Sequence, residues 1–215
     1  MTAPPSRRRD PTVRLHDRLA TLSDAPPPTD QADAAVLILL GFGTKGLEVL
    51  AEQRADRPGD PWSGQVGLPG GHTEPGDRSL TETVLRELRE EVGIRASDLD
   101  GPPKLFDTRR ARPSGLRVAV FVGSLQKSVE SFGVLNPTEV ATTFWLSLDA
   151  LDHIESRPRT TALGEIYVDT VVYEGHIVWG FTLRVLQDFA AWVALSEESG
   201  TMGPRELHRG RSQAL

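Results

Sequence analysis

The stretch "GGHTEPGDRSLTETVLRELREEVGI", residues 70–94, leads from two adjacent glycines through a Pro-Gly turn into a strongly acidic segment. Ser79 followed three residues later by Glu82 is a capping-box pattern, which is typical of a helix N-terminus. Gly93 supplies a residue that readily adopts the left-handed conformation at a helix end. The stretch therefore predicts a helix from about Leu80 to Val92.

One face of this predicted helix is apolar, and one flank is acidic. The apolar residues recur about every four positions: Leu80, Val84, Leu85, Leu88 and Val92. This spacing favours packing of the helix against a sheet. Measured from Leu88 at about 100° per residue, three carboxylates lie on the same side, at about 60°, 100° and 160°: Glu91, Glu87 and Glu90. Three carboxylates are therefore expected to fan along one flank.

Two interpretations fit the acidic flank. A solvated helix with ion pairs one turn apart is the first, and Arg86 is placed to bridge Glu82 and Glu90 in that way. The glycine approach favours a metal site instead. Gly70 and Gly71 offer backbone carbonyls near the carboxylates, and hard cations such as Mg²⁺ take oxygen ligands while keeping waters and substrate phosphates. Because concentrated negative charge is costly without counter-ions, we predict a cation site here.

The composition argues against several protein classes. The chain has 215 residues, enough for one domain with extensions, and its formal charge of −6 argues against binding by neutralisation of nucleic-acid phosphates. The absence of cysteine removes thiolate metal sites and thiol nucleophiles. The most apolar run, residues 34–40, is far shorter than the ~20 residues of a membrane helix, and no hydrophobic signal region follows the basic N-terminus. We expect a cytoplasmic protein with no nucleic-acid partner and no membrane partner.

The rest of the chain predicts strands around two or three helices. We expect a tail with a short helix in residues 1–30, one domain in 31–197, and a polar tail in 198–215. Apolar or alternating segments predict strands at 34–40, 47–54, 104–110, 116–125, 139–148 and 165–175. A final helix is predicted to begin near Gly180. Because the regular β-α alternation of a doubly wound sheet is missing, the fold class is α+β with a mixed sheet.

The glycine turn "GFGTKG" at residues 41–46 leaves two interpretations open. It matches the G-x-G-x-x-G dinucleotide fingerprint, but it also suits a hairpin between two strands. A dinucleotide fold needs an acidic residue about 20 positions on, at the end of a second strand. Asp60 lies instead in a turn-rich segment, so we favour the hairpin.

The segment from Gly71 to Ile94 resembles the signature box of the Nudix hydrolases, which cleave nucleoside diphosphates linked to another moiety. In that box a glycine is followed after five residues by Glu, and after seven more by Arg-Glu, an aliphatic residue, any residue, Glu-Glu, any residue, glycine and an aliphatic residue. Gly71 matches the first glycine, and "RELREEVGI" from Arg86 matches the second half. Asp77 stands in place of the usual Glu, and eight residues separate it from Arg86. The resemblance implies a mixed β-sheet sandwiched between α-helices.

Several segments resemble the coenzyme A pyrophosphatase branch of this family, which has the longer spacing with Asp in place of Glu. They are "WSGQVGLPGG" at 62–71, "TEVATTFWLSL" at 138–148 and "HIVWGFTLRVL" at 176–186. The branch motif L-L-T-x-R-S, followed by a second Arg, is kept only in part: Arg54 is present, Ala55 replaces the serine, and Arg57 is out of register. The resemblance implies hydrolysis of coenzyme A or an acyl derivative. The alternatives are an ADP-ribose or other nucleotide pyrophosphatase, an oxidised-nucleotide sanitising hydrolase, or a non-catalytic nucleotide-binding module.

The resemblance also implies roles for individual residues. A Mg²⁺ or Mn²⁺ cofactor would be held by Glu87, Glu90, Glu91 and the carbonyl of Gly71. Catalytic roles fall on Glu90 as first candidate for the base, on Glu139 as second candidate, and on Arg86, which would orient Glu90. Candidates for binding a small-molecule diphosphate substrate are Arg54, Arg57, Gly70, His72 and Arg109. For Glu139, His72 and Arg109, a solvated surface position is the alternative. Dimers are common in the family, so a homodimer is an open alternative to a monomer.

Overall fold

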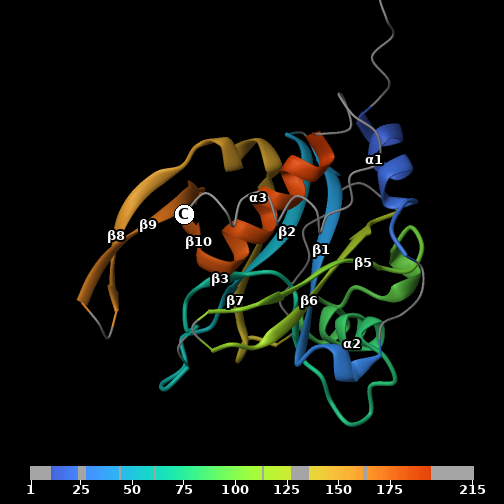
Figure 1. The fold of residues 1–215 in the computed structure, drawn as a ribbon, viewed down its shortest axis with the longest axis horizontal. Coiled ribbons are helices and arrows are strands. Elements are labelled where there is room, and N and C mark those ends of the chain that lie inside the picture. The colour runs from blue at the N-terminus through green and yellow to red at the C-terminus, as the bar shows by residue number, and fades with distance from the viewer. Residues whose placement is uncertain are drawn as a thin grey trace, which may run out of the picture.

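The computed structural model describes residues 11–23, 28–43, 45–60, 62–112, 114–126, 136–161 and 164–194. Within these ranges seven strands form one mixed sheet and three form a second, antiparallel sheet, with helices packed against them (Figure 1). The α+β architecture, with a mixed sheet between helices, is therefore confirmed. The predicted polar tail 198–215 and the first ten residues of the N-terminal tail lie outside the described residues. In the described ranges, no helix has the length and apolar character that crossing a membrane requires.

The large sheet is built around β1. Its strands are β1 Ala34–Gly43, β2 Gly46–Arg54, β3 Val66–Gly67, β4 Gly70–His72, β5 Lys104–Arg110, β6 Arg117–Ser124 and β7 Val140–Ser147. The main order is β3-β2-β1-β6-β5, with β4 on β1 and β7 on β2. Only the β1–β6 pair among these is parallel. The sheet therefore mixes both pairing modes, as predicted.

The glycine turn at residues 41–46 is a hairpin connection. β1 and β2 pair antiparallel up to Gly43 opposite Gly46. A dinucleotide fingerprint requires a helix directly after the glycines, and a strand follows instead. The hairpin prediction is confirmed, and the dinucleotide interpretation is wrong.

The helix α2, Leu80–Val92, has the bounds that its caps predict. The Ser79 hydroxyl accepts a hydrogen bond from the Glu82 backbone N–H at 3.2 Å, and Gly93 adopts φ 75°. The capping box closes differently from its ideal form, because the Glu82 carboxylate accepts from the backbone N–H of Arg78. Both ends of α2 are thus determined by residues within one helical turn.

Two apolar cores lie on opposite faces of the large sheet, because β1 is buried on both sides. Residues of one parity, such as Leu37 and Leu39, pack with the apolar stripe of α2. Residues of the other parity, such as Ile38 and Leu40, pack with α3, Gly180–Ala194. The N-terminal helix α1, Pro11–Leu19, joins this second core through Leu15. The sheet therefore presents distinct side chains to α2 and to α3.

The second sheet consists of β8 Glu155–Thr161, β9 Gly164–Tyr173 and β10 His176–Trp179, and its β8–β9 hairpin extends away from the other elements (Figure 1). β8 was not among the predicted strands, because it is an exposed edge strand that carries Pro158 and lacks apolar alternation. Short 3₁₀ helices complete the described elements: Thr29–Gln31, Ala96–Asp98 and Leu148–Asp152.

Candidate functional site

The glycine pair brings β4 close to both β1 and α2. Gly70 has φ 144°, and a Cβ on it would lie 2.2 Å from the carbonyl oxygen of Ala35. A Cβ on Gly71 would lie 2.4 Å from Oε1 of Glu87. Neither position accommodates a side chain without displacing a neighbour. The bare glycines therefore set β4 directly beside the acidic flank of the helix.

Three carboxylates converge at this point. Glu87, Glu91 and Glu139 each offer an oxygen atom, and these atoms all lie within 4.8 Å of one another. Glu91 is only 3% exposed, and its Oε2 accepts a hydrogen bond from the Gly70 backbone N–H at 3.0 Å. Such a set of hard oxygen donors suits Mg²⁺ or Mn²⁺ rather than a soft metal.

Glu139 reaches the group from a distant part of the chain. It precedes β7, which pairs antiparallel with β2 so that Val140 lies opposite Arg54. The Glu139 carbonyl accepts a hydrogen bond from the Ala55 N–H at 2.8 Å. The side chain of Arg57 lies 3.9 Å from the Glu139 carboxylate. Strand pairing therefore brings this carboxylate, and an arginine beside it, to the acidic helix.

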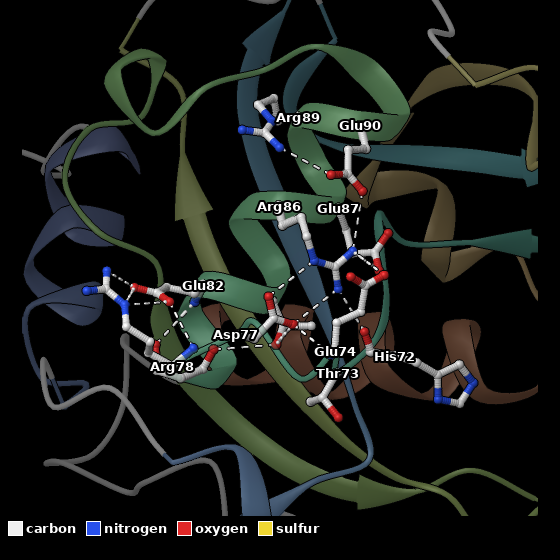
Figure 2. A network of polar contacts seen from close by, with 12 residues as sticks. His72, Thr73, Glu74, Asp77, Arg78, Glu82, Arg86, Glu87, Arg89 and Glu90 are labelled. Carbon is white, nitrogen blue, oxygen red and sulfur yellow. Dashed lines mark hydrogen bonds and ion pairs between the residues drawn. The ribbon is translucent and has the colours of Figure 1, made fainter.

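Arg86 links the helix to the loop that precedes it (Figure 2). Its guanidinium forms ion pairs with Asp77 at 3.2 Å, with Glu87 at 2.9 Å and with Glu90 at 3.3 Å. It also donates a hydrogen bond to the His72 carbonyl at 2.9 Å. The expected contact with Glu82 is absent from the described interactions of Arg86, because Glu82 pairs with Arg78. Arg86 thus ties Asp77, Glu87 and Glu90 to the β4 backbone.

Glu90 lies outside the converging group. Its side chain is 45% exposed and pairs with both Arg86 and Arg89 (Figure 2). Glu90 thus lies in ion-pair contact with Arg86 at 3.3 Å. Of the three box carboxylates, the structure therefore brings two into the group with Glu139 and leaves Glu90 at its exposed side.

Candidate substrate-binding residues are distributed unevenly around this site. Arg54 forms an ion pair with Asp60 at 3.0 Å, and His72 is exposed. Arg109 lies apart from the group. Its guanidinium is buried and pairs with Asp107 and with Asp188 of α3, each at 2.8 Å, so it is on the opposite face of the sheet from α2. Arg109 therefore lies outside the candidate site.

A fourth carboxylate was missed in the sequence. Glu52 of β2 is 1% exposed and lies on the same face as Leu50, which packs with α2. The carboxyls of Glu52 and Glu91 are hydrogen-bonded to each other. An acidic residue at an inward-facing position of an otherwise apolar strand, "VLAEQ", is the signal that could have identified it.

Burial is the largest cause of the raised pKa values of Glu52, Glu87 and Glu91. The charge of Glu52 raises the pKa of Glu91 further, because like charges oppose each other's ionisation. Asp77 behaves in the opposite way: although burial raises its pKa, hydrogen bonds from the Arg86 guanidinium and from backbone and hydroxyl donors lower it overall. Protonation of Glu52, Glu87 and Glu91 is thus favoured in the metal-free protein, and a bound divalent cation would favour their ionised forms instead.

The raised pKa of Glu91 predicts that the metal-free protein loses stability as the pH rises. When the pKa of a carboxyl is higher in the folded state, its contribution to stability is fully present at pH values below the ordinary pKa of 4.5. This contribution is lost as the pH rises through the folded-state pKa. One proton corresponds to about 1.4 kcal/mol per pH unit. Urea unfolding in EDTA should therefore show wild type losing stability relative to Glu91→Gln between about pH 4.5 and pH 8. Equal slopes for both proteins would contradict this prediction.

Comparisons with known proteins identify relatives of this chain. A family model described as NUDIX domain matches residues 30–164. Proteins from Yersinia pestis (strain Pestoides F) and Yersinia pseudotuberculosis serotype O:1b, each named an uncharacterized Nudix hydrolase NudL, are 33% identical over 138 residues. The match covers 62% of this chain and 66% of each relative, a little under two thirds of their length. The NUDIX domain of Shewanella oneidensis NrtR, solved with ADP ribose, is 19% identical with a TM-score of 0.50, covering 84% of this chain and 97% of that chain. This likeness supports the fold.

Proposed function

Since the chain belongs to the Nudix family, we propose that it is a metal-dependent pyrophosphohydrolase that cleaves a nucleoside diphosphate linked to another moiety. The observation that carries this proposal is the convergence of Glu87, Glu91 and Glu139, with oxygen atoms within 4.8 Å of one another. Three carboxylates supply the hard oxygen donors that Mg²⁺ or Mn²⁺ requires. A module that only bound a nucleotide would have no need for such a group.

Each residue then has a role that follows from its contacts. Glu87, Glu91 and Glu139 would hold the cation, with the Gly71 carbonyl as a further donor. A bound Mg²⁺ or Mn²⁺ ion would supply charge stabilisation at the diphosphate oxygens and a lowered pKa for the attacking water. Glu90 is the first candidate to accept the proton of this water, because it lies outside the converging group and stays exposed. Glu139 is the weaker candidate for the base, since its carboxylate belongs to the group.

Arg86 acts in this proposal through the residues that it orients. Its ion pairs with Glu87 and Glu90 fix two carboxylates of the site, and its bond to the His72 carbonyl fixes them relative to β4. A guanidinium stays protonated, so it cannot serve as the base. His72 and Gly70 would border the bound diphosphate from β4, next to the carboxylate group.

For the substrate we propose coenzyme A or an acyl derivative, cut into 4′-phosphopantetheine and 3′,5′-ADP. The support is the resemblance of the Asp77 spacing and of three further segments to the coenzyme A pyrophosphatase branch. Arg57 lies beside Glu139, and Arg54 lies opposite Val140, the residue that follows Glu139. These two cations are candidates to bind the extra 3′-phosphate. Charged hydrogen bonds of this kind discriminate strongly between phosphorylated and unphosphorylated ligands.

Coenzyme A should be a better substrate than dephospho-coenzyme A. Loss of one charge-assisted contact is worth about 1.5 to 3 kcal/mol, or roughly ten- to a hundredfold in kcat/KM. The measurement is product identification by mass spectrometry, with initial rates, after incubation with Mn²⁺ and each compound. Arg57→Gln should narrow the difference between the two compounds if this arginine reads the 3′-phosphate.

ADP-ribose is the control substrate, because it has the diphosphate and adenosine but lacks both the 3′-phosphate and the pantetheine arm. A higher kcat/KM for ADP-ribose than for coenzyme A would overturn the coenzyme A assignment and leave the pyrophosphohydrolase. No product from any diphosphate in the presence of Mn²⁺ would overturn the enzymatic proposal itself.

A further inference from the structure

Glu52 carries a buried oxygen without a partner. Its side chain is 1% exposed, and among the described residues its Oε2 makes no hydrogen bond. Buried polar atoms are nearly always satisfied, so an orphaned carboxylate oxygen requires a specific explanation. The burial of Glu52 on β2 makes solvent an unsuitable partner.

The neighbours of Glu52 come from two strands and from the helix α2. β2 places it opposite Gly67 on one side and Thr143 on the other. A Cβ on Gly67 would lie 3.9 Å from Oε1 of Glu52, so Gly67 borders this carboxyl at ordinary contact distance. On the helix side its carboxyl is hydrogen-bonded to that of Glu91. Glu52 therefore adjoins the group through Glu91, on the side of the sheet.

The charges around Glu52 are poorly balanced. The Glu87 and Glu139 carboxylates repel the charge of Glu52, and the Arg54 guanidinium attracts it. Arg54 is shared, however, because it also forms an ion pair with Asp60. Ion pairs with Arg86 and Arg57 balance Glu87 and Glu139, but among the described residues no ion pair involves Glu52 or Glu91, so a bound cation would offset their charges.

We propose that Glu52 is a further metal-ligating residue, which binds a divalent cation together with Glu91 from the sheet side of the site. This inference rests on the cation site of the proposed function and extends it by one carboxylate. The motif L-L-T-x-R-S has threonine at the position that Glu52 occupies in this chain. Mg²⁺ and Mn²⁺ are the ions that such an all-oxygen set suits.

The test is a titration of the metal-free protein with Mn²⁺. Isothermal titration calorimetry measures the affinity and the number of sites, and the rise in Tm with Mn²⁺ concentration is a second measure of binding. Glu52→Gln keeps the shape of the side chain and removes its charge, and Glu52→Thr introduces the residue of the related motif. Both variants should bind Mn²⁺ at least about tenfold more weakly, or at fewer sites, than wild type. Circular dichroism and urea unfolding establish that each variant is folded.

Glu48→Gln is the matched control. Glu48 is also a buried carboxylate on β2 and points to the same face, at 6% exposure, but it lies against Gly43 rather than Glu91. This variant should retain wild-type Mn²⁺ binding. Wild-type affinity and site number in a folded Glu52 variant would overturn the inference. If wild type binds Mn²⁺ but hydrolyses no diphosphate, the proposed function fails while the Glu52 result stands on its own.

Discussion

Replacing Glu91 by glutamine should lower the rate of diphosphate hydrolysis by at least roughly 10², by analogy with the loss of one transition-state stabiliser. Glu91 belongs to the carboxylate group, and glutamine keeps its size and an oxygen that can accept a hydrogen bond from the Gly70 N–H. The substitution therefore removes a charged metal ligand with little change in packing. Initial rates with coenzyme A or another cleaved diphosphate, at saturating Mn²⁺, measure the effect. Removal of the metal by EDTA should abolish hydrolysis by wild type.

Glu82→Gln provides the control on the same helix. Glu82 pairs with Arg78 at the N-terminus of α2 and does not belong to the converging group. Its substitution should leave turnover close to that of wild type. Full activity of wild type in EDTA, or of Glu91→Gln in Mn²⁺, would rule out the metal-dependent mechanism.

The Glu91→Gln variant should combine this loss of activity with a gain in stability. Without metal, the raised pKa of Glu91 keeps its buried carboxyl protonated at neutral pH, whereas the same carboxyl is ionised in the unfolded chain. Folding of the wild type must therefore take up a proton at a cost in free energy, and glutamine avoids that cost. Opposite changes in activity and stability are the usual trade-off at functional sites. This combination distinguishes the loss of a metal ligand from simple misfolding, which would lower both quantities.

Leu88→Ala should reduce the free energy of unfolding by ~2 to 5 kcal/mol, because truncation of a fully buried leucine removes apolar contacts and leaves a cavity. Leu88 has 0% exposure and lies in the core between α2 and the sheet, among Leu37, Leu39 and Val84. Urea unfolding at constant Mn²⁺ concentration measures the change. The loss is also expected to weaken hydrolysis, since α2 carries Glu87 and Glu91.

Leu85→Ala is the matched control for this prediction. Leu85 lies on the same helix but is only partly buried against the same core. Its truncation should cost clearly less than that of Leu88, because less apolar area is lost and solvent can fill the space. Equal losses in the two variants would mean that the packing of α2 does not depend on its buried stripe.

The sequence alone predicted the elements whose signals are local. The bounds of α2 follow from Ser79 and Gly93, whose capping bonds join residues no more than four apart. The β1–β2 hairpin follows from alternation and a glycine turn. The signature box from Gly71 to Ile94 could be recognised from the spacing of its glycine, arginine and glutamate residues. β8 escaped prediction because an exposed edge strand carries no apolar period.

Only the tertiary structure decided which charges meet. The pairing of β2 with β7 brings Glu139 and Glu52 to the helix that carries Glu91, and no local pattern in the chain specifies that register. The same register places Arg57 at the edge of the group. Arg109, a cation that the sequence offered equally well, is directed to the other face of the sheet and paired with Asp188. Side-chain alternation across a strand determines such choices, because a shift of one residue would exchange the two faces.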